Sequence, residues 1–282
     1  MGAYVCTIAG GKGGVGRTTT AINLGIVFEE GGYDTVLVDA DLGMTNVGKM
    51  LAVESDETLH DVLGGNAAVS DALTDTEHRL SVIAGDGDLE AYANADPANL
   101  RGVIETLQES FDVVLVDTSP KISHEMAVPV GLADGTLLVS TADRVALTDA
   151  VRTADFADRV DGNVLGLMLT RVTDPEQVEV DHGEIDAPLL GVVPEDADAA
   201  TEEPLVSNAE ESPAAQAYRD LTAVLIRGLE AGEIPDDEEP VFEESWFGAT
   251  ADDDAGEAAE EAGEDDEDDE DTDNLTMFRP RF

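Results

Sequence analysis

The sequence predicts an α/β fold that is doubly wound, with helices on both faces of a mainly parallel sheet of about seven to eight strands. Apolar runs alternate along the chain with helix-period segments, which is the pattern of such a sheet. Several runs are apolar throughout, as parallel strands buried on both faces are. The expected strands are residues 3–9, 35–38, 80–84, 112–116, 135–139, 163–169 and 189–193. The chain of 282 residues is long enough for one large domain of this kind or two smaller ones.

Two of the intervening helices are marked by their first residues and their apolar faces. Asp96 and Pro97 are typical of an N-cap and a first turn, and apolar residues follow at i, i+3, i+4 and i+7. Ser212 and Pro213 begin another helix in the same way. Its apolar face ends near residue 230, and we expect the folded domain, residues 1–230, to end there.

Beyond this domain the composition changes sharply. Residues 231–274 form an acidic tail, and its central part, residues 252–273, is nearly all Asp, Glu, Ala and Gly. Such a segment cannot bury enough apolar area to offset its conformational entropy, so we expect disorder. Trp246–Phe247 forms an apolar island in the tail, and residues 275–282 form a short apolar and basic C-terminal motif that ends in MFRPRF.

The formal net charge of −50 is extreme, and the tail does not carry all of it. Residues 1–230 hold 42 acidic and 12 basic residues, and the chain has only three lysines. An acidic, lysine-poor surface is typical of a protein that works in very high salt, as in a haloarchaeon, because salt screens the self-repulsion. The same charge argues against DNA or RNA as a partner, since phosphate backbones need a basic patch.

The single cysteine, Cys6, lies in the first apolar run and excludes an internal disulfide and any CxxC site. The sequence has no basic leader, and no apolar run reaches the roughly 18 residues of a membrane helix. We therefore expect a cytoplasmic protein.

Residues 10–20, GGKGGVGRTTT, have the spacing of a phosphate-binding loop. The pattern G-x4-G-[K/R]-T follows an apolar strand and opens a helix, which is the context that such a loop requires. Its glycines let backbone N–H groups surround phosphate oxygens, and the helix N-terminus adds positive potential. This loop predicts nucleotide binding and a P-loop NTPase fold. The expected phosphate-side residues are Gly11, Lys12, Gly13, Gly14, Val15, Gly16, Arg17, Thr18 and Thr19.

Two positions of this loop have separate consequences. Arg17 stands where such loops normally have lysine. Arginine also binds phosphate, but its side chain is larger and planar. We therefore expect nucleotide binding, while the sequence leaves the rate of hydrolysis open. Thr18 is placed to ligate Mg²⁺ through its hydroxyl.

The stretch KGGVGRT resembles the deviant phosphate loop of the MinD/ParA ATPases, and the resemblance extends over about residues 3–230. It implies ATP and Mg²⁺ as cofactors and an ATP-dependent homodimer in which Lys12 reaches the partner's nucleotide. The segment 36–46, VLVDADLGMTN, is similar to the family's first switch. By that match Asp41 would orient the attacking water, and Asp39 and Asn46 would help to hold the Mg²⁺ and the phosphates. The alternative is that these carboxylates only cap a helix or turn.

Residues 113–117, VVLVD, resemble Walker B, which places Asp117 near the Mg²⁺ shell. The family's usual Pro-Ala-Gly turn is replaced here by residues 118–121, so the second switch departs from the pattern. Lys121 either supplies a charge there or is a solvated loop residue.

Two later segments resemble those that surround the purine base in MinD. Thr170 and Arg171 end one strand, and the sequence GVVPED at residues 191–196 places Pro194 and Asp196 at the adenine. The alternative is an ordinary loop between strand and helix.

Among the members of this family, a MinD-like positioning ATPase fits best. An iron–sulfur relative would need more than one cysteine, and a ParA-like partition ATPase would need a basic DNA-binding face. A nucleotide-gated scaffold with little hydrolysis stays open because of Arg17. Pro280 prevents a continuous membrane helix, and our hypothesis is that residues 275–282 dock to a protein or membrane surface, which would place the chain at a membrane or a cell pole. The alternative is an unstructured end without a role.

Overall fold

The computed structural model describes residues 2–176, 185, 187–196, 202–231, 234 and 239–247. Most of the expected acidic tail, and all of the C-terminal motif at 275–282, lie outside the described residues.

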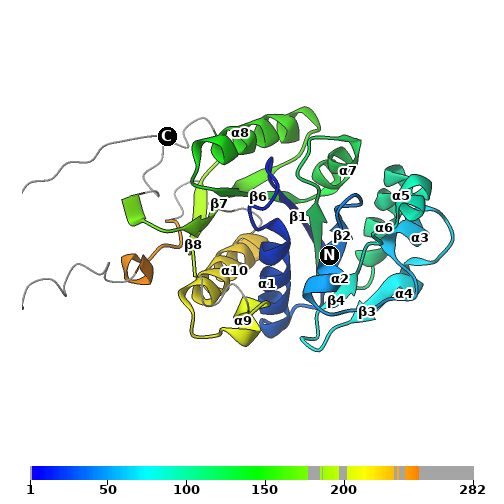
Figure 1. Cartoon of the computed structure of the whole chain (residues 1–282), viewed down its shortest axis with the longest axis horizontal. Helices are drawn as coiled ribbons and strands as arrows, with labels where there is room; N and C mark the ends of the chain where they lie inside the picture. Colours follow the sequence, from blue (N-terminus) through cyan, green and yellow to red (C-terminus); the bar gives the residue numbers. More distant parts are fainter. Residues whose placement is uncertain are drawn as a thin grey trace, which may run out of the picture. The chain divides into compact units, whose positions relative to one another are not determined.

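An eight-stranded sheet with the order β3-β4-β2-β5-β1-β6-β7-β8 forms the centre of the fold (Figure 1). Its strands are β1 (Tyr4–Ala9), β2 (Thr35–Ala40), β3 (Leu73–Asp75), β4 (Ser81–Ile83), β5 (Val113–Thr118), β6 (Gly135–Thr141), β7 (Val164–Val172) and β8 (Leu189–Pro194). Only the β3–β4 pair is antiparallel among the paired strands of the described part. The predicted α/β fold with a mainly parallel sheet is therefore confirmed.

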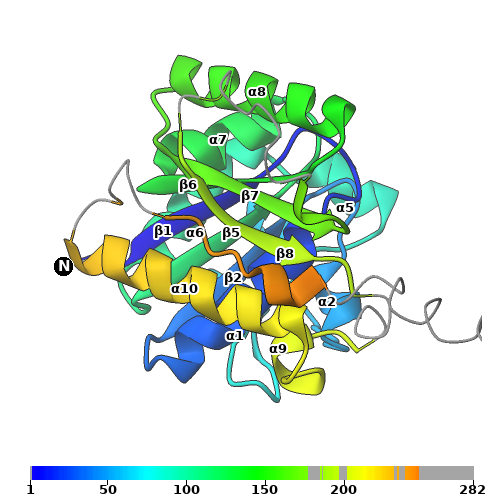
Figure 2. The same ribbon diagram turned by 90° about the vertical axis from the view of Figure 1, so that its left-hand side faces the viewer.

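Helices cover both faces of this sheet. They are α1 (Arg17–Glu30), α2 (Val47–Met50), α3 (Leu59–Leu63), α4 (Val69–Ala72), α5 (Leu89–Asn94), α6 (Leu100–Leu107), α7 (His124–Leu132), α8 (Arg144–Arg159), α9 (Leu205–Asn208) and α10 (Pro213–Ala231). Figures 1 and 2 show α1 and α10 on one face and α7 and α8 on the other. Asp96 caps the 3₁₀ turn Pro97–Asn99 that leads into α6, as its sequence predicts.

Alternating side chains of the strands build two cores, one on each face. Leu37 packs in the cluster that contains Ile22 of α1 and Tyr218 of α10. Its neighbours Val36 and Val38 point the other way, into the cluster formed with α3 and α6. Because side chains alternate along a strand, this double burial requires the continuously apolar runs. Because the paired strands run parallel, their carboxyl ends meet at one edge of the sheet, where ligands bind in such folds.

Residues 239–247, which we call the strap, pack beside β8. Val241 pairs in parallel with Gly191, donating its N–H to the Leu190 carbonyl at 3.0 Å and accepting from the Val192 N–H at 2.9 Å. The strap ends in the 3₁₀ turn Glu244–Phe247. The packed part of the chain thus continues beyond residue 230, where the composition places the domain end, because the apolar side chains of the strap cover the edge of β8.

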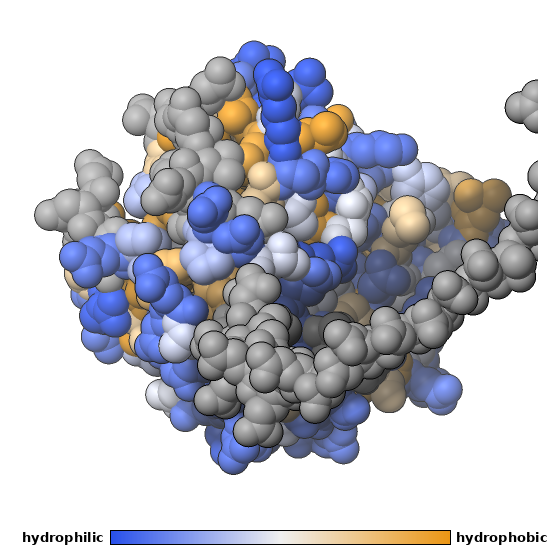
Figure 3. Space-filling model, turned by 60° about the vertical axis from the view of Figure 1, so that its left-hand side comes forward, coloured by the Kyte–Doolittle hydropathy of each residue, from blue (hydrophilic) through white to orange (hydrophobic). Residues whose placement is uncertain are grey.

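One face of the described part is mostly polar. Figure 3 shows hydrophilic residues over most of the described area of one face, with hydrophobic residues in scattered patches. None of the helices in the described ranges combines the length and the apolar character that crossing a bilayer requires.

Candidate functional site

The phosphate loop connects β1 to α1 at the carboxyl edge of the sheet. Gly16, the N-cap of α1, has φ 91°, a left-handed conformation that favours glycine. A Cβ atom on Gly11 would lie 2.4 Å from the Asp149 carbonyl oxygen of α8, so only glycine lets the helix approach the loop this closely. The nine residues predicted for the phosphates therefore share one loop and the first turn of α1.

Arg17 lies beneath this loop and is 7% exposed. Its Nη1 donates to the carbonyl oxygens of Gly10 at 2.7 Å and Lys12 at 3.3 Å, and its Nη2 lies 4.0 Å from Asp41 Oδ2. Burial lowers the pKa of Arg17, while the nearby carboxylates of Asp117 and Asp41 oppose that shift. The guanidinium group therefore holds the loop in place through hydrogen bonds to its backbone carbonyls.

Three predicted metal ligands meet at the end of β2 and β5. Asp39 and Asp117 are register partners in these neighbouring strands, so their side chains lie on the same face. Thr18 donates its hydroxyl to Asp117 Oδ2 at 2.6 Å. Asp39 Oδ2 accepts backbone N–H bonds from Asn46 at 3.0 Å and Val47 at 3.1 Å.

These two carboxyl groups fit a magnesium ion. The Oδ1 atoms of Asp39 and Asp117 are both buried without a hydrogen-bond partner. Burial raises the pKa of each group, and for Asp39 the charge of Asp117 raises it further. Mg²⁺ takes oxygen ligands, commonly one or two carboxylates with water and phosphate oxygens completing the octahedron. Asp39 and Asp117 supply two carboxylates of that kind. Within the described residues no group of three or more His, Cys, Asp or Glu side chains is placed to hold a metal ion.

The first-switch segment follows β2 and lies beside the carboxylates. Asp41 is buried, and its backbone carbonyl accepts the Met44 N–H at 3.1 Å. Burial raises the pKa of its carboxyl group above the ordinary value, and the nearby charge of Arg17 offsets part of that rise. Asn46 occupies the N-cap position of α2 without a side-chain capping bond, and its amide donates instead to the Met44 carbonyl at 2.8 Å. In this structure it is thus the backbone of Asn46, and not its side chain, that contacts Asp39.

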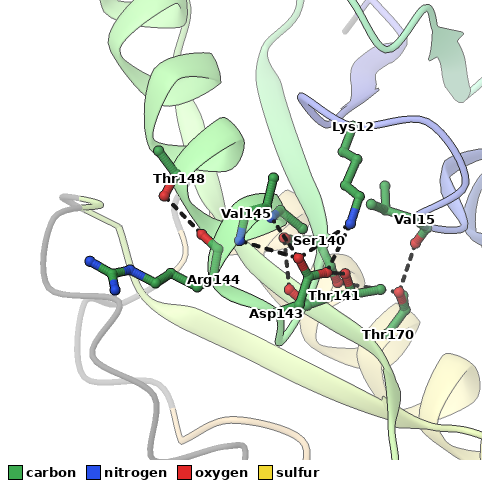
Figure 4. A network of polar contacts seen from close by, with 10 residues as sticks. Lys12, Val15, Ser140, Thr141, Asp143, Arg144, Val145, Thr148 and Thr170 are labelled. Carbon is green, nitrogen blue, oxygen red and sulfur yellow. Dashed lines mark hydrogen bonds and ion pairs between the residues drawn. The ribbon is translucent and has the colours of Figure 1, made fainter.

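Lys12 is partly exposed at the rim of the loop and is held by Asp143, the N-cap of α8 (Figure 4). Its Nζ lies 3.1 and 3.2 Å from the two carboxylate oxygens. Asp143 also accepts the hydroxyl of Thr141 and the N–H groups of Val145 and Ala146. These bonds, with the hydroxyl of Thr141 contributing most, lower the pKa of Asp143 to about 2.

The residues predicted for the base divide between two places. Thr170 donates its hydroxyl to the Val15 carbonyl at 2.7 Å, so it contacts the phosphate loop directly. Arg171 follows it with φ 54° and an exposed side chain. Pro194 ends β8, and Asp196 lies two residues further along.

Three exposed hydrophobic side chains stand around this edge. Met44, Ile122 and Val145 follow the carboxyl ends of β2, β5 and β6 and are all largely solvent-exposed. Lys121, in the loop after β5, is exposed as well.

Comparison with known proteins places this site in a family. The model of the CobQ/CobB/MinD/ParA nucleotide-binding domain matches residues 6–204. The chain belongs to this family. An uncharacterized ATP-binding protein of Methanocaldococcus jannaschii, 31% identical over 232 residues, is covered to 88% of its length and covers 79% of the chain.

Solved structures of this MinD/ParA family have the same fold. The cell division ATPase MinD of Pyrococcus furiosus superposes with a TM-score of 0.75 at 32% identity, covering 80% of this chain and 99% of that one. The septum site-determining protein MinD of Pyrococcus horikoshii, solved in complex with Mg-ADP, gives 0.74 at 31% identity, with coverages of 81% and 98%.

Sequence reasoning missed two features of the structure, the partner of Lys12 and the packing of the strap. The contact of Asp143 with Lys12 was not predicted, because a lone aspartate before a helix predicts only an N-cap. Its position just after a buried strand, at the edge where ligands bind, was the available signal. Trp246 and Phe247 were visible as an apolar island, but the acidic residues around them pointed to a disordered tail.

Proposed function

We propose that this member of the MinD/ParA family is an ATP-dependent dimerisation switch of the MinD type, which hydrolyses ATP and positions other cellular machinery. The observation that carries the proposal is the convergence of the phosphate loop, two unpartnered buried carboxylate oxygens and a partly exposed Lys12 at one edge of the sheet. The relation to a MinD solved with Mg-ADP supports adenine nucleotide and Mg²⁺ as the ligands.

Each residue has a definable part in phosphoryl transfer, which depends mostly on positioning and charge neutralisation. The loop N–H groups and Arg17 would hold the phosphates, and Thr18, Asp39 and Asp117 would hold the magnesium ion. The ion would supply positive charge at the phosphates. The carboxylate of Asp41 lies near the guanidinium of Arg17, and it would accept a hydrogen bond from the attacking water.

Dimerisation is supported by what surrounds Lys12. The lysine is partly exposed, and Met44, Ile122 and Val145 present apolar surface on the same edge. A second copy of the chain that faces this edge would cover these side chains and receive Lys12 at its nucleotide. Release of the phosphate would then remove the charge that holds Lys12 across the interface.

The role in positioning is supported by the similarity to the cell division ATPase MinD. We propose that the chain acts in the cytoplasm and attaches peripherally to a protein or membrane surface through residues 275–282, while DNA is not a partner. The candidate machinery is that of division, motility or chemosensing, or cell shape. Deleting 275–282 should abolish the localised pattern of a tagged protein and leave ATP binding intact; an unchanged pattern would exclude the docking role.

A second function, a nucleotide-gated scaffold with little hydrolysis, is favoured by one contact. The guanidinium of Arg17 lies 4.0 Å from Asp41, the residue proposed to orient the water. If Asp41 stays paired with Arg17 after ATP binds, the water is not activated, and ATP then holds the dimer without turnover.

ATPase assays in molar KCl with Mg²⁺ separate the two functions. We expect wild type to hydrolyse ATP faster than Asp41→Ala, and Arg17→Lys to be faster than wild type because the smaller ammonium releases Asp41. A wild-type rate equal to that of Asp41→Ala, with ATP binding retained by both, would reject the enzyme and leave the scaffold.

A further inference from the structure

The strap brings aromatic side chains to the end of the sheet where the base of a nucleotide would lie. Because Val241 runs parallel to β8, the residues that follow it advance toward the carboxyl end of that strand. The turn Glu244–Phe247 lies beside the end of β8 (Figure 2). Its two aromatic residues, Trp246 and Phe247, line the same pocket as Pro194. The edge that a parallel sheet uses for ligands is thus extended by a segment that follows the last helix.

At this position the surface forms an open pocket of about 290 Å³. Its lining comes from three adjacent segments, the ends of β7 and β8 and the strap: Val172, Thr173, Pro194, Glu195, Trp246 and Phe247. This volume lies just below the roughly 300–1,000 Å³ of sites that hold whole small molecules. It therefore suits a flat ring system and not an entire nucleotide.

The pocket is connected to the phosphate loop through a single strand. Thr170, whose hydroxyl bonds to the Val15 carbonyl, precedes Val172 by two residues in β7, and the strand is irregular between them at Arg171. The carboxylate of Glu195 disfavours a phosphate in the pocket, since like charges repel there. One nucleotide could therefore occupy both sites, with its phosphates at the loop and its base in the pocket.

Trp246 has the burial that stacking requires. Its ring is half-buried and packs against the core cluster on the α10 side, which fixes its position. Phe247 packs on the opposite side with the cluster of β7 and β8, and its ring contacts Phe242 with centroids 5.6 Å apart. The strap is thus anchored from both faces of the sheet, while part of the indole stays open to the pocket.

We propose that the strap completes the nucleotide site and that Trp246 stacks on the purine base. The inference rests on the proposed nucleotide-binding function and adds a residue to its base end. Stacking on any purine needs only a π-face, so the strap provides affinity for adenine and guanine nucleotides alike.

The chain's single tryptophan makes the proposal directly testable. Titrating the full chain in molar KCl and Mg²⁺, we expect ADP to change the emission of Trp246. Tripolyphosphate should compete with ADP and leave the emission unchanged, because it fills the loop alone. An emission change of the same size with tripolyphosphate would overturn the proposal.

Substitutions test whether the ring contributes affinity. Trp246→Leu keeps apolar packing but removes the stacking surface, and calorimetry should show ADP binding weakened about 5- to 100-fold with tripolyphosphate binding unchanged. Trp246→Phe should recover most of the loss, because a smaller ring still stacks. Equal ADP affinity in wild type and Trp246→Leu, at equal melting temperatures, would reject the strap's role. If wild type binds neither ligand, the nucleotide site itself is rejected.

Discussion

The ion pair between Lys12 and Asp143 should oppose dimerisation, because the lysine has to leave it to reach a partner's nucleotide. The Nζ–Oδ distances are 3.1 and 3.2 Å, and the two side chains are 41% and 46% exposed. Exposed pairs of this kind stabilise by about 0.2–1 kcal/mol. Two such pairs break when one dimer forms, so the pair favours the monomer by about 0.4–2 kcal/mol per dimer.

Asp143→Asn removes the charge and keeps the helix cap, since asparagine caps as well as aspartate does. We therefore expect its ATP-bound dimer to form with a dissociation constant roughly 2- to 30-fold lower than wild type. Screening should bring the effect toward the lower value in molar salt. Because the folded pKa of Asp143 lies below the ordinary aspartate value, the pair persists above that value and is lost only as pH falls through about 2. The effect should thus be constant between about pH 5 and 9.

Sedimentation equilibrium with a non-hydrolysable ATP analogue and Mg²⁺ measures this change. Glu105→Gln is the matched control, because it removes another exposed ion pair, with Arg101 of α6, away from the loop. Dimerisation of Asp143→Asn that equals or is weaker than that of wild type, with Glu105→Gln unchanged, would refute the idea that Asp143 restrains Lys12.

Two further substitutions test the metal site and the loop. Burial raises the pKa of Asp39, so its contribution to stability is greatest at acidic pH and is lost as pH rises through the raised value. With a chelator present to remove metal ions, Asp39→Asn should therefore raise the free energy of unfolding by about 1–3 kcal/mol at pH 8 and by less at pH 5. The control Asp158→Asn, at an exposed position, should not raise it. A gain in stability that is independent of pH would contradict this reasoning. Thr170→Val removes the hydroxyl that holds the Val15 carbonyl, and it should weaken ADP binding about 5-fold, corresponding to about 1 kcal/mol, by calorimetry. Thr148→Val, which loses only a bond within α8, is the control, and equal ADP affinities for both variants would exclude a role for Thr170.

The sequence is most informative where burial and chemistry act together. Continuous apolar runs predict the parallel strands because both faces of the sheet are buried, as Val36, Leu37 and Val38 illustrate. The strand β3 has no such run: at the antiparallel edge, two of its three residues are partly buried and Asp75 is exposed. Tertiary pairing, and not local pattern, makes that segment a strand.

The same difference applies to the site. Thr18, Asp39 and Asp117 follow from motifs that place oxygen atoms at strand ends, and the structure brings the three together. Their roles toward a bound ion stay predictions. Composition alone could not predict the strap, because a few apolar residues among acidic ones are compatible both with a disordered tail and with a segment that covers the edge of a sheet. Only the pairing of Val241 with β8 distinguishes the two.

The proposed switch depends on Lys12 acting across a dimer, and the mass of the ATP-bound species tests this most directly. In a background of Asp41→Ala, which should slow hydrolysis, light scattering with ATP and Mg²⁺ should give the mass of a dimer. Adding Lys12→Ala should give a monomer that still binds ATP, as calorimetry would record. A dimer of equal stability with and without Lys12 would contradict the proposed switch.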